Sequence, residues 1–251
     1  MENEAYIFDL DGTLVNNQAF KKTILELPEI LNININPEKF YNEFLKTYYL
    51  TVAKRDLIRA FDWEYILKQT CTRIGSSYTP GVFTQRFIKN IDDGFVQLIP
   101  EALKTLENLK NRSAKIAILT NGKRIFQERV IKRTNLINFV DILITSDELP
   151  KPKPYPEAFD YVCKMLQGMT ITFVGDHPFY DIYPAANYCI PNIYWLTDEF
   201  PQGDYQLSQL ISYISNITWT KYRWKISPTQ TALKKKIHVI NKLPSLCNRN
   251  S

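Results

Sequence analysis

A chain of 251 residues, 45% of them hydrophobic, is long enough to bury a substantial core and has the composition of an ordinary globular protein. Its four cysteines are scattered without paired spacing, which argues against a zinc site or a disulfide framework and indicates a reducing compartment. The first expected strand begins within six residues, leaving no room for a signal peptide, and no apolar run is long enough to span a bilayer. We therefore expect a cytoplasmic protein.

The net charge of +5 belongs to the C-terminal tail. Residues 216–251 contain eight Lys or Arg and no Asp or Glu, so the first 215 residues carry a net charge of −3. This distribution argues against nucleic-acid binding by the main part of the chain. In the tail, Leu233, Ile237 and Ile240 are spaced for one face of a helix beside three lysines. We expect this face to pack on the domain with the lysines in solvent; contact with an acidic partner, anionic lipid or nucleic acid is the alternative.

Residues 6–14 form an apolar run that ends in two carboxylates, a glycine and a hydroxyl. The apolar half predicts a central parallel strand that is covered on both faces. Asp9 and Asp11 follow at its carboxyl end, where open α/β sheets bind ligands, and Gly12 lets the backbone turn. Two carboxylates this close repel unless a cation joins them, which favours Mg²⁺. Taken alone, the motif is equally compatible with a polar turn that has no chemical role.

Between residues 16 and 97 the apolar residues recur at helical spacing, which predicts a small helical bundle. We expect three helical faces, formed by Phe40, Phe44 and Tyr48; by Ile58, Phe61, Tyr65 and Ile66; and by Phe83, Phe87 and Ile91. Most of these aromatic residues are expected in the core, and a minority in a substrate pocket. A helical insert after the first strand predicts a cap that excludes water and selects the substrate.

From residue 100 onward strands alternate with helices, which predicts an α/β fold with a doubly wound parallel sheet. The expected strands after the first are Lys115–Leu119, Phe139–Thr145, Thr170–Val174 and Ile193–Leu196. We expect a catalytic core made of residues 1–15 and 98–200, a cap made of residues 16–97, and a C-terminal helix with a basic tail in residues 201–251.

Two further stretches carry groups that suit a phosphate. Thr120 and Asn121 follow an apolar strand, where a hydroxyl and backbone N–H groups can hold a phosphate oxygen, although this is also a good turn sequence. Lys153 lies in a proline-rich stretch that holds the chain extended, and a fixed ammonium can neutralise a phosphoryl group. Lys151 fits a solvated loop equally well.

The last informative stretch is residues 173–182. Asp176 follows an apolar strand and a glycine, so it is placed to complete a metal site with Asp9. Asp181 is expected just outside that site, supporting it or capping the next helix. For His177 we expect a local hydrogen-bonding role rather than contact with the substrate.

These four stretches, in this order, resemble the haloacid dehalogenase-like (HAD) superfamily of phosphotransferases over roughly residues 4–200. Asp9-Leu-Asp11-Gly-Thr resembles the first motif of the family, and Thr120 the second. The third, Lys-Pro-x-Pro-x-x-aromatic, fits from Lys153 to Phe159 and fails from Lys151. The stretch from Asp176 to Asp181 resembles the acidic fourth motif. The helical insertion is similar to the first cap class, and the resemblance implies a Rossmann-like core.

The resemblance implies a Mg²⁺-dependent phosphatase for a small phosphorylated metabolite. Asp9 would be the nucleophile and Asp11 the general acid and base. The metal would be held by Asp9, Asp176 and the backbone carbonyl of Asp11, and the phosphate by Thr120, Asn121 and Lys153.

Asp11 favours a phosphatase over a dehalogenase, because a leaving alkoxide needs a proton and a halide does not. A phosphomutase and an inactive binding module are the alternatives. Sugar phosphates, phosphoglycolate, nucleotides and pyridoxal phosphate all remain open as substrates.

Overall fold

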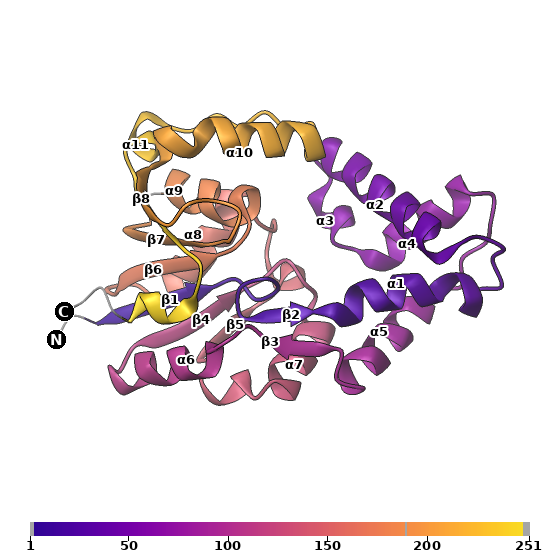
Figure 1. The fold of residues 1–251 in the computed structure, drawn as a ribbon, viewed down its shortest axis with the longest axis horizontal. Helices are drawn as coiled ribbons and strands as arrows, with labels where there is room; N and C mark the ends of the chain where they lie inside the picture. The colour runs from indigo at the N-terminus through magenta and orange to yellow at the C-terminus, as the bar shows by residue number, and fades with distance from the viewer. Residues whose placement is uncertain (1–2, 189, 248–251) are drawn as a thin grey trace.

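The computed structural model describes residues 3–188 and 190–247, and it places a helical cap beside a core built on a seven-stranded sheet (Figure 1). β8 runs antiparallel to its neighbour β9, and the other strands run parallel. In spatial order the strands are β5 (Ile142–Ile144), β4 (Lys115–Leu119), β1 (Glu4–Phe8), β6 (Thr170–Gly175), β7 (Asn192–Leu196), β9 (Lys236–Ile240) and β8 (Gly203–Gln206). The predicted α/β fold with a mostly parallel sheet is confirmed.

β1 is covered on both faces, as its continuous apolar sequence predicts. Tyr6 and Phe8 belong to one hydrophobic cluster, which includes α6 (Ala102–Asn111) and α7 (Arg124–Arg133). Ala5 and Ile7 point the other way, into a second cluster. That cluster includes α8 (Pro156–Met165), α9 (Tyr183–Asn187) and α10 (Leu207–Tyr222). The strand that directly precedes Asp9 is therefore packed on both sides.

The cap is inserted between two short antiparallel strands, β2 (Val15–Asn17) and β3 (Val96–Leu98). Its helices are α1 (Gln18–Ile30), α2 (Pro37–Ala53), α3 (Leu57–Ala60), α4 (Trp63–Arg73) and α5 (Val82–Asp92). The helix expected through Ile58 and Ile66 is broken in two. The side chains of Asp56 and Asp62 accept hydrogen bonds from the first turns of α3 and α4, and these caps start a new helix each time.

Short helical turns complete the chain. They are η1 (Leu136–Asn138), η2 (Ser146–Glu148), η3 (Pro178–Ile182), α11 (Gln230–Leu233) and η4 (Leu243–Leu246). η1 and η2 flank β5, which is shorter than the expected strand Phe139–Thr145.

The expected amphipathic helix through Leu233, Ile237 and Ile240 is wrong. Leu233 ends α11, and after two further residues the chain forms β9, which lies between β7 and β8 in the sheet. Ile237, Val239 and Ile240 are buried there. β-branched residues suit a strand better than a helix, and the helical spacing of the three residues was coincidental. The apolar side chains of the tail do pack on the core.

The cap contacts the core on the side of α10 as well as through its two strands (Figure 1). The hydroxyls of Tyr48 in α2 and Tyr180 in η3 are 2.8 Å apart, and the rings of Tyr49 and Tyr222 are 5.7 Å apart. The guanidinium of Arg55 lies 4.3 Å from the centre of the Trp224 ring.

No helix within residues 3–188 and 190–247 is long and apolar enough to cross a membrane. Cys71, Cys163 and Cys247 are free thiols. Cys189 lies outside the described residues.

Candidate active site

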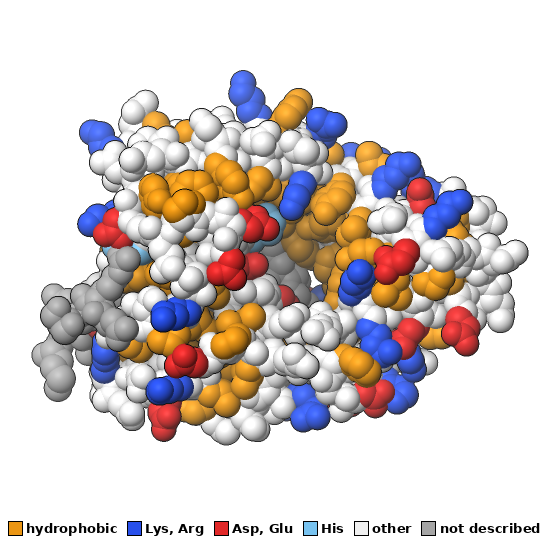
Figure 2. All heavy atoms as spheres, viewed as in Figure 1, with side chains coloured by type: hydrophobic (Ala, Val, Ile, Leu, Met, Phe, Trp, Pro, Cys, Tyr) orange, Lys and Arg blue, Asp and Glu red, His pale blue; other side chains and the backbone are white. Residues whose placement is uncertain are grey.

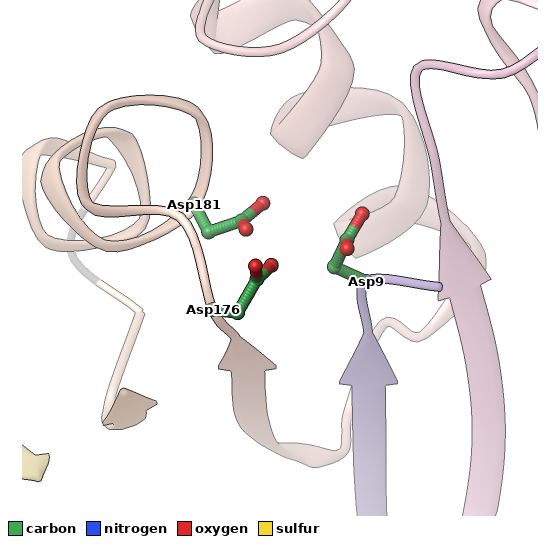
Figure 3. Close-up of side chains that lie close together, drawn as sticks. All are labelled: Asp9, Asp176 and Asp181. Carbon is green, nitrogen blue, oxygen red and sulfur yellow. The ribbon is translucent and has the colours of Figure 1, made fainter. Parts of the chain in front are cut away.

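Three carboxylates, two from neighbouring strand ends and one from a helical turn, converge at the carboxyl edge of the sheet (Figure 3). Asp9 follows β1 and Asp176 follows β6, which pair in parallel register, so their chain positions bring them together. Asp181 joins them from η3, and one oxygen from each of the three residues lies within 4.8 Å of the others. The sequence predicts Asp181 just outside the metal site. In the structure its carboxylate lies beside those of Asp9 and Asp176.

Lys153 is the cation of this cluster. Its Nζ donates to Oδ1 of Asp9 over 2.7 Å and to Oδ1 of Asp181 over 2.6 Å, and the side chain is fully buried. Lys151 is exposed, with its Nζ 2.6 Å from Glu157. The third motif fits from Lys153 and not from Lys151, and the structure agrees, because Lys153 is buried in the cluster and Lys151 is exposed.

The acidic cluster carries more negative charge than Lys153 neutralises. Burial raises the pKa of Asp9 to about 6, although the adjacent Lys153 ammonium lowers it. Burial, and then the charge of Asp9, raises the pKa of Asp176 well above its usual range. Three carboxylates facing one ammonium are a suitable donor set for a hard divalent cation.

Gly12 makes room for Asp176. Its φ of +94° lies in the left-handed region, and a Cβ built on it would be 2.3 Å from Oδ2 of Asp176. Only glycine fits this turn without displacing the carboxylate. Thr13 donates from Oγ1 to Oδ1 of Asp176 over 3.3 Å, so the whole turn after Asp11 supports Asp176.

The Asp11 side chain is held by two amides. Asn17 Nδ2 donates to Oδ1 over 2.8 Å, and Gln127 Nε2 donates to Oδ2 over 2.7 Å. Burial raises the pKa of Asp11, and the two hydrogen bonds act in the opposite direction. Neither amide was expected from the sequence. Gln127 lies in the helix that follows the second motif, and that position was the only signal for it.

Thr120 lies at the end of β4, buried beside Asp11. Its Oγ1 accepts hydrogen bonds from the N–H of Gly122 over 3.1 Å and from Nε2 of Gln127 over 3.3 Å. Because both of these contacts use the oxygen as an acceptor, the hydroxyl proton is available for another group.

Asn121 joins the second and third motifs. Its Nδ2 donates to the carbonyl of Lys153 over 3.0 Å, and its Oδ1 accepts from the N–H of Lys153 over 2.9 Å. The side chain thus fixes the backbone that positions the ammonium, which the sequence did not indicate.

His177 has the expected local role. Its Nδ1 accepts hydrogen bonds from the N–H groups of Phe179 and Tyr180, and its Nε2 lies 2.9 Å from the Tyr222 hydroxyl. Burial lowers the pKa of His177 to about 3, so the ring is neutral. With Nδ1 accepting, the proton is on Nε2 and is donated to Tyr222.

A cavity of about 370 Å³ lies above the carboxylates, within the usual size range for small-molecule sites. Core residues around the carboxylates form the floor of this cavity, and cap residues form much of the roof opposite them. Figure 2 shows a hollow between core and cap, with hydrophobic side chains on its cap side. The aromatic residues that line it are Phe20, Phe61, Trp63, Phe87, Phe126 and Tyr180.

Residues 4–188 match the family described as haloacid dehalogenase-like hydrolase, which is more than half of the chain. The chain belongs to this family. The resemblance expected from the four motifs is therefore confirmed, and all four motifs of this hydrolase lie within the matched region.

The hydrolase is similar to curated proteins that are named as phosphatases. It is 29% identical over 190 residues to the glyceraldehyde 3-phosphate phosphatase of Methanocaldococcus jannaschii, covering 71% of this chain and 78% of that protein. It is 27% identical over 192 residues to pyrophosphatase PpaX of Bacillus thuringiensis, covering 74% of this chain and 80% of that one.

Solved structures share the fold of the hydrolase over nearly its whole length. The HAD-hydrolase YfnB of Bacillus subtilis, bound to magnesium, superposes with a TM-score of 0.65 at 21% identity, covering 98% of this chain and 97% of that one. The L-2-haloacid dehalogenase of Xanthobacter autotrophicus has a TM-score of 0.64 at 18% identity, covering 99% and 100%. At these identities the likeness concerns the fold, because one fold serves several reactions.

Proposed function

We propose that this hydrolase is a Mg²⁺-dependent phosphatase of small phosphomonoesters that acts through an aspartyl-phosphate on Asp9. One observation carries the choice among reactions of the family: a carboxyl group, Asp11, lies two residues after the nucleophile and is held by Asn17 and Gln127. A positioned acid is needed to protonate a leaving alkoxide, and it has little use when a halide leaves. The phosphatase names of the curated relatives agree with this choice.

In the first step a carboxylate oxygen of Asp9 attacks phosphorus, and the bond from phosphorus to the ester oxygen breaks. Burial raises the pKa of Asp11, which favours its protonated form, and in this form Asp11 gives a proton to the departing oxygen. In the second step Asp11, now ionised, takes a proton from water. The water attacks the phosphorus of the aspartyl-phosphate, releasing phosphate and regenerating Asp9. General acid–base assistance of this kind contributes about 10²–10⁴ in rate.

The phosphoryl oxygens would be held by groups that surround the nucleophile. The Thr120 hydroxyl has its proton free, and the Lys153 ammonium is fixed beside Asp9. The backbone N–H at Asn121 is the third proposed contact. These donors are positioned before the reaction, so little reorganisation opposes the build-up of charge.

The carboxylates of Asp9 and Asp176 and the backbone carbonyl of Asp11 would hold Mg²⁺, with Asp181 beside them. The bound ion would offset the repulsion between the acidic cluster and the phosphate. The fit rests on the convergence of three carboxylates around a single ammonium and on the space that Gly12 leaves for Asp176.

The decisive experiment measures phosphate release from a panel of phosphomonoesters with Mg²⁺ and with EDTA, for wild type and for Asp9→Asn. We expect metal-dependent release by wild type and none by the variant, because an amide of the same shape is a poor nucleophile. Equal release by both proteins would contradict the mechanism.

If folded wild type releases no phosphate from the panel, three alternatives remain: a phosphatase with a very narrow substrate range, a phosphomutase and a binding module. A phosphomutase would isomerise a substrate without releasing phosphate, and a binding module would leave every substrate unchanged. Product analysis by phosphorus NMR separates the two.

A further inference from the structure

The two halves of the cavity differ in chemistry. The floor holds the acidic cluster with Thr120 and Lys153, and in the proposed function it takes the phosphoryl group. The roof consists of six aromatic rings contributed by α1, α4, α5, α7, η3 and the turn after α3. The organic part of a substrate bound at the floor must therefore lie against aromatic surface.

The aromatic rings of the roof pack on one another. The rings of Phe20 and Trp63 lie 4.8 Å apart, and Phe61 packs edge-on against Trp63 at 5.9 Å. Phe61 also packs against Tyr180 at 5.5 Å. Of the six rings, only those of Phe20 and Trp63 stay partly exposed, while the others are buried. Phe20 and Trp63 are thus the ring surfaces available to a ligand, and their neighbours fix them in place.

In the part of the chain that the structure describes, no side chain of the cavity is a free cation for a second negative charge. Among the described residues, Lys153 is the only cationic side chain in its lining, and it already pairs with Asp9 and Asp181. Lys123 directly follows Gly122, which lines the cavity. Its Nζ, however, lies 3.0 Å from Oδ2 of Asp62 in the cap and pairs with that carboxylate. Both ring nitrogens of His177 already have partners, because Nδ1 accepts from two backbone N–H groups and Nε2 lies 2.9 Å from the Tyr222 hydroxyl. A carboxylate or second phosphate under this roof would lose its hydration without gaining a partner.

We infer that the substrate is the phosphate ester of an uncharged alcohol that carries a planar aromatic or heteroaromatic ring. The inference rests on the proposed phosphatase function and deepens it. The ring lies against Phe20 and Trp63, and the phosphoryl group lies at Asp9. The same geometry disfavours pyrophosphate and phosphoglycolate, because each has a second anionic group.

Binding to wild type tests this independently of turnover. Phosphonates in which a methylene replaces the ester oxygen cannot be hydrolysed, so calorimetry with Mg²⁺ reports affinity alone. The three probes are phenethylphosphonate, its para-carboxy derivative and the phosphonate analogue of glycerol phosphate. We expect phenethylphosphonate to bind at least about tenfold more tightly than each of the others, since an unpaired charge or a lost ring contact costs this much.

Variants of Trp63 test whether this ring causes the preference for phenethylphosphonate. Trp63→Leu should weaken phenethylphosphonate binding about 5- to 150-fold, the range for loss of one aromatic stacking contact, and should leave the glycerol phosphate analogue nearly unchanged. Trp63→Phe keeps a ring and should restore most of the affinity. Trp219→Leu, on the exposed face of α10, is the control and should bind all three like wild type. Thermal melts confirm that each variant is folded.

The outcomes separate this inference from the proposed function. Equal or tighter binding of the para-carboxy or glycerol phosphate analogue, or no binding of any probe, overturns the inference even if wild type releases phosphate from other esters. Preferential binding of phenethylphosphonate without release of phosphate from benzyl phosphate supports the ring preference and contradicts the phosphatase. Preferential binding together with release from benzyl phosphate supports both.

Discussion

Gln127 and Asp11 are 116 residues apart in the chain, and Nε2 of Gln127 donates a hydrogen bond to Oδ2 of Asp11 over 2.7 Å. The amide favours the carboxylate form of Asp11 and so limits the rise of its pKa. It also contacts the Thr120 hydroxyl, which links the proposed general acid to the proposed phosphate site.

Replacing Gln127 with Leu should raise the pKa of Asp11 further, because a hydrogen bond to its ionised form is lost. We expect kcat/KM to fall about 10- to 100-fold, the usual size of one hydrogen bond to a charged group. The alkaline limb of its pH profile, where Asp11 loses its proton, should move to higher pH. Gln85→Leu on the exposed face of α5 is the control. A fall in activity with an unchanged pH profile would contradict the positioning role of Gln127.

Lys153→Met should remove activity and destabilise the fold. Without the ammonium, the buried carboxylates of Asp9 and Asp181 lose their compensating charge, and breaking such a pair costs about 3–5 kcal/mol. At about 2–4 °C per kcal/mol this corresponds to a fall in Tm of about 6–20 °C at neutral pH, measured by calorimetry without added metal. Lys151→Met makes the same change two residues away at an exposed position and should leave kcat and Tm nearly unchanged. Equal effects of the two changes would argue against the buried ion pairs.

Gly12→Ala and Gly168→Ala distinguish backbone strain from displacement of Asp176. Both glycines have positive φ, of +94° and +82°, so each change should lower stability by about 1 kcal/mol. At Gly168 nothing lies within 4 Å of the new Cβ, whereas at Gly12 it meets the Asp176 carboxylate. Only Gly12→Ala should therefore lose activity and weaken Mg²⁺ binding, measured by calorimetry. Full activity in Gly12→Ala would show that Asp176 is not needed where it lies.

Glu26 joins α1 to α5 and should make the cap sensitive to acid. Its carboxylate accepts from Nε of Arg86 over 2.7 Å and from Nδ2 of Asn90 over 2.8 Å, and these contacts lower the pKa of Glu26 from 4.5 to about 2. A lowered pKa means that the stabilisation is fully present above pH 4.5 and is lost as the pH falls towards 2.

Glu26→Gln should therefore be less stable than wild type at neutral pH, by about 1–2 kcal/mol for partly exposed charged contacts. The difference in the urea midpoint should shrink between pH 5 and pH 3. Glu29→Gln, on the exposed face of the same helix, should match wild type at every pH. A difference that stays constant with pH would exclude the ionised carboxylate as its source.

The sequence predicted the site residues that directly follow strands. Asp9, Thr120 and Asp176 each come after an apolar run, and parallel strands bring such positions to one edge of the sheet. Asn17 and Gln127 lie at helix or strand positions whose direction depends on how the cap and α7 pack, so no local pattern marks them. Asp181 enters the acidic cluster because η3 turns its side chain back towards Lys153.

Elsewhere the error came from competing local signals. Helical spacing suggested one helix across Phe61, but Asp62 is a good cap and starts a second helix there. In the tail, the spacing of three apolar residues outweighed the β-branched composition of residues 236–240, and the partner strands that decide the matter are distant in the chain.

The contact between α2 and α10 gives the cap a second attachment, opposite the β2–β3 strands that connect it to the core. A domain joined to its neighbour along one edge can swing open as a hinge, but one attached on two sides can move mainly by the sliding of packed helices. We therefore expect shear motions of small amplitude, with the Tyr49 and Tyr222 rings remaining in contact as substrate enters. The distance between the roof and the proposed nucleophile would then vary little during turnover. The enzyme would therefore select substrates by their length as well as by their charge.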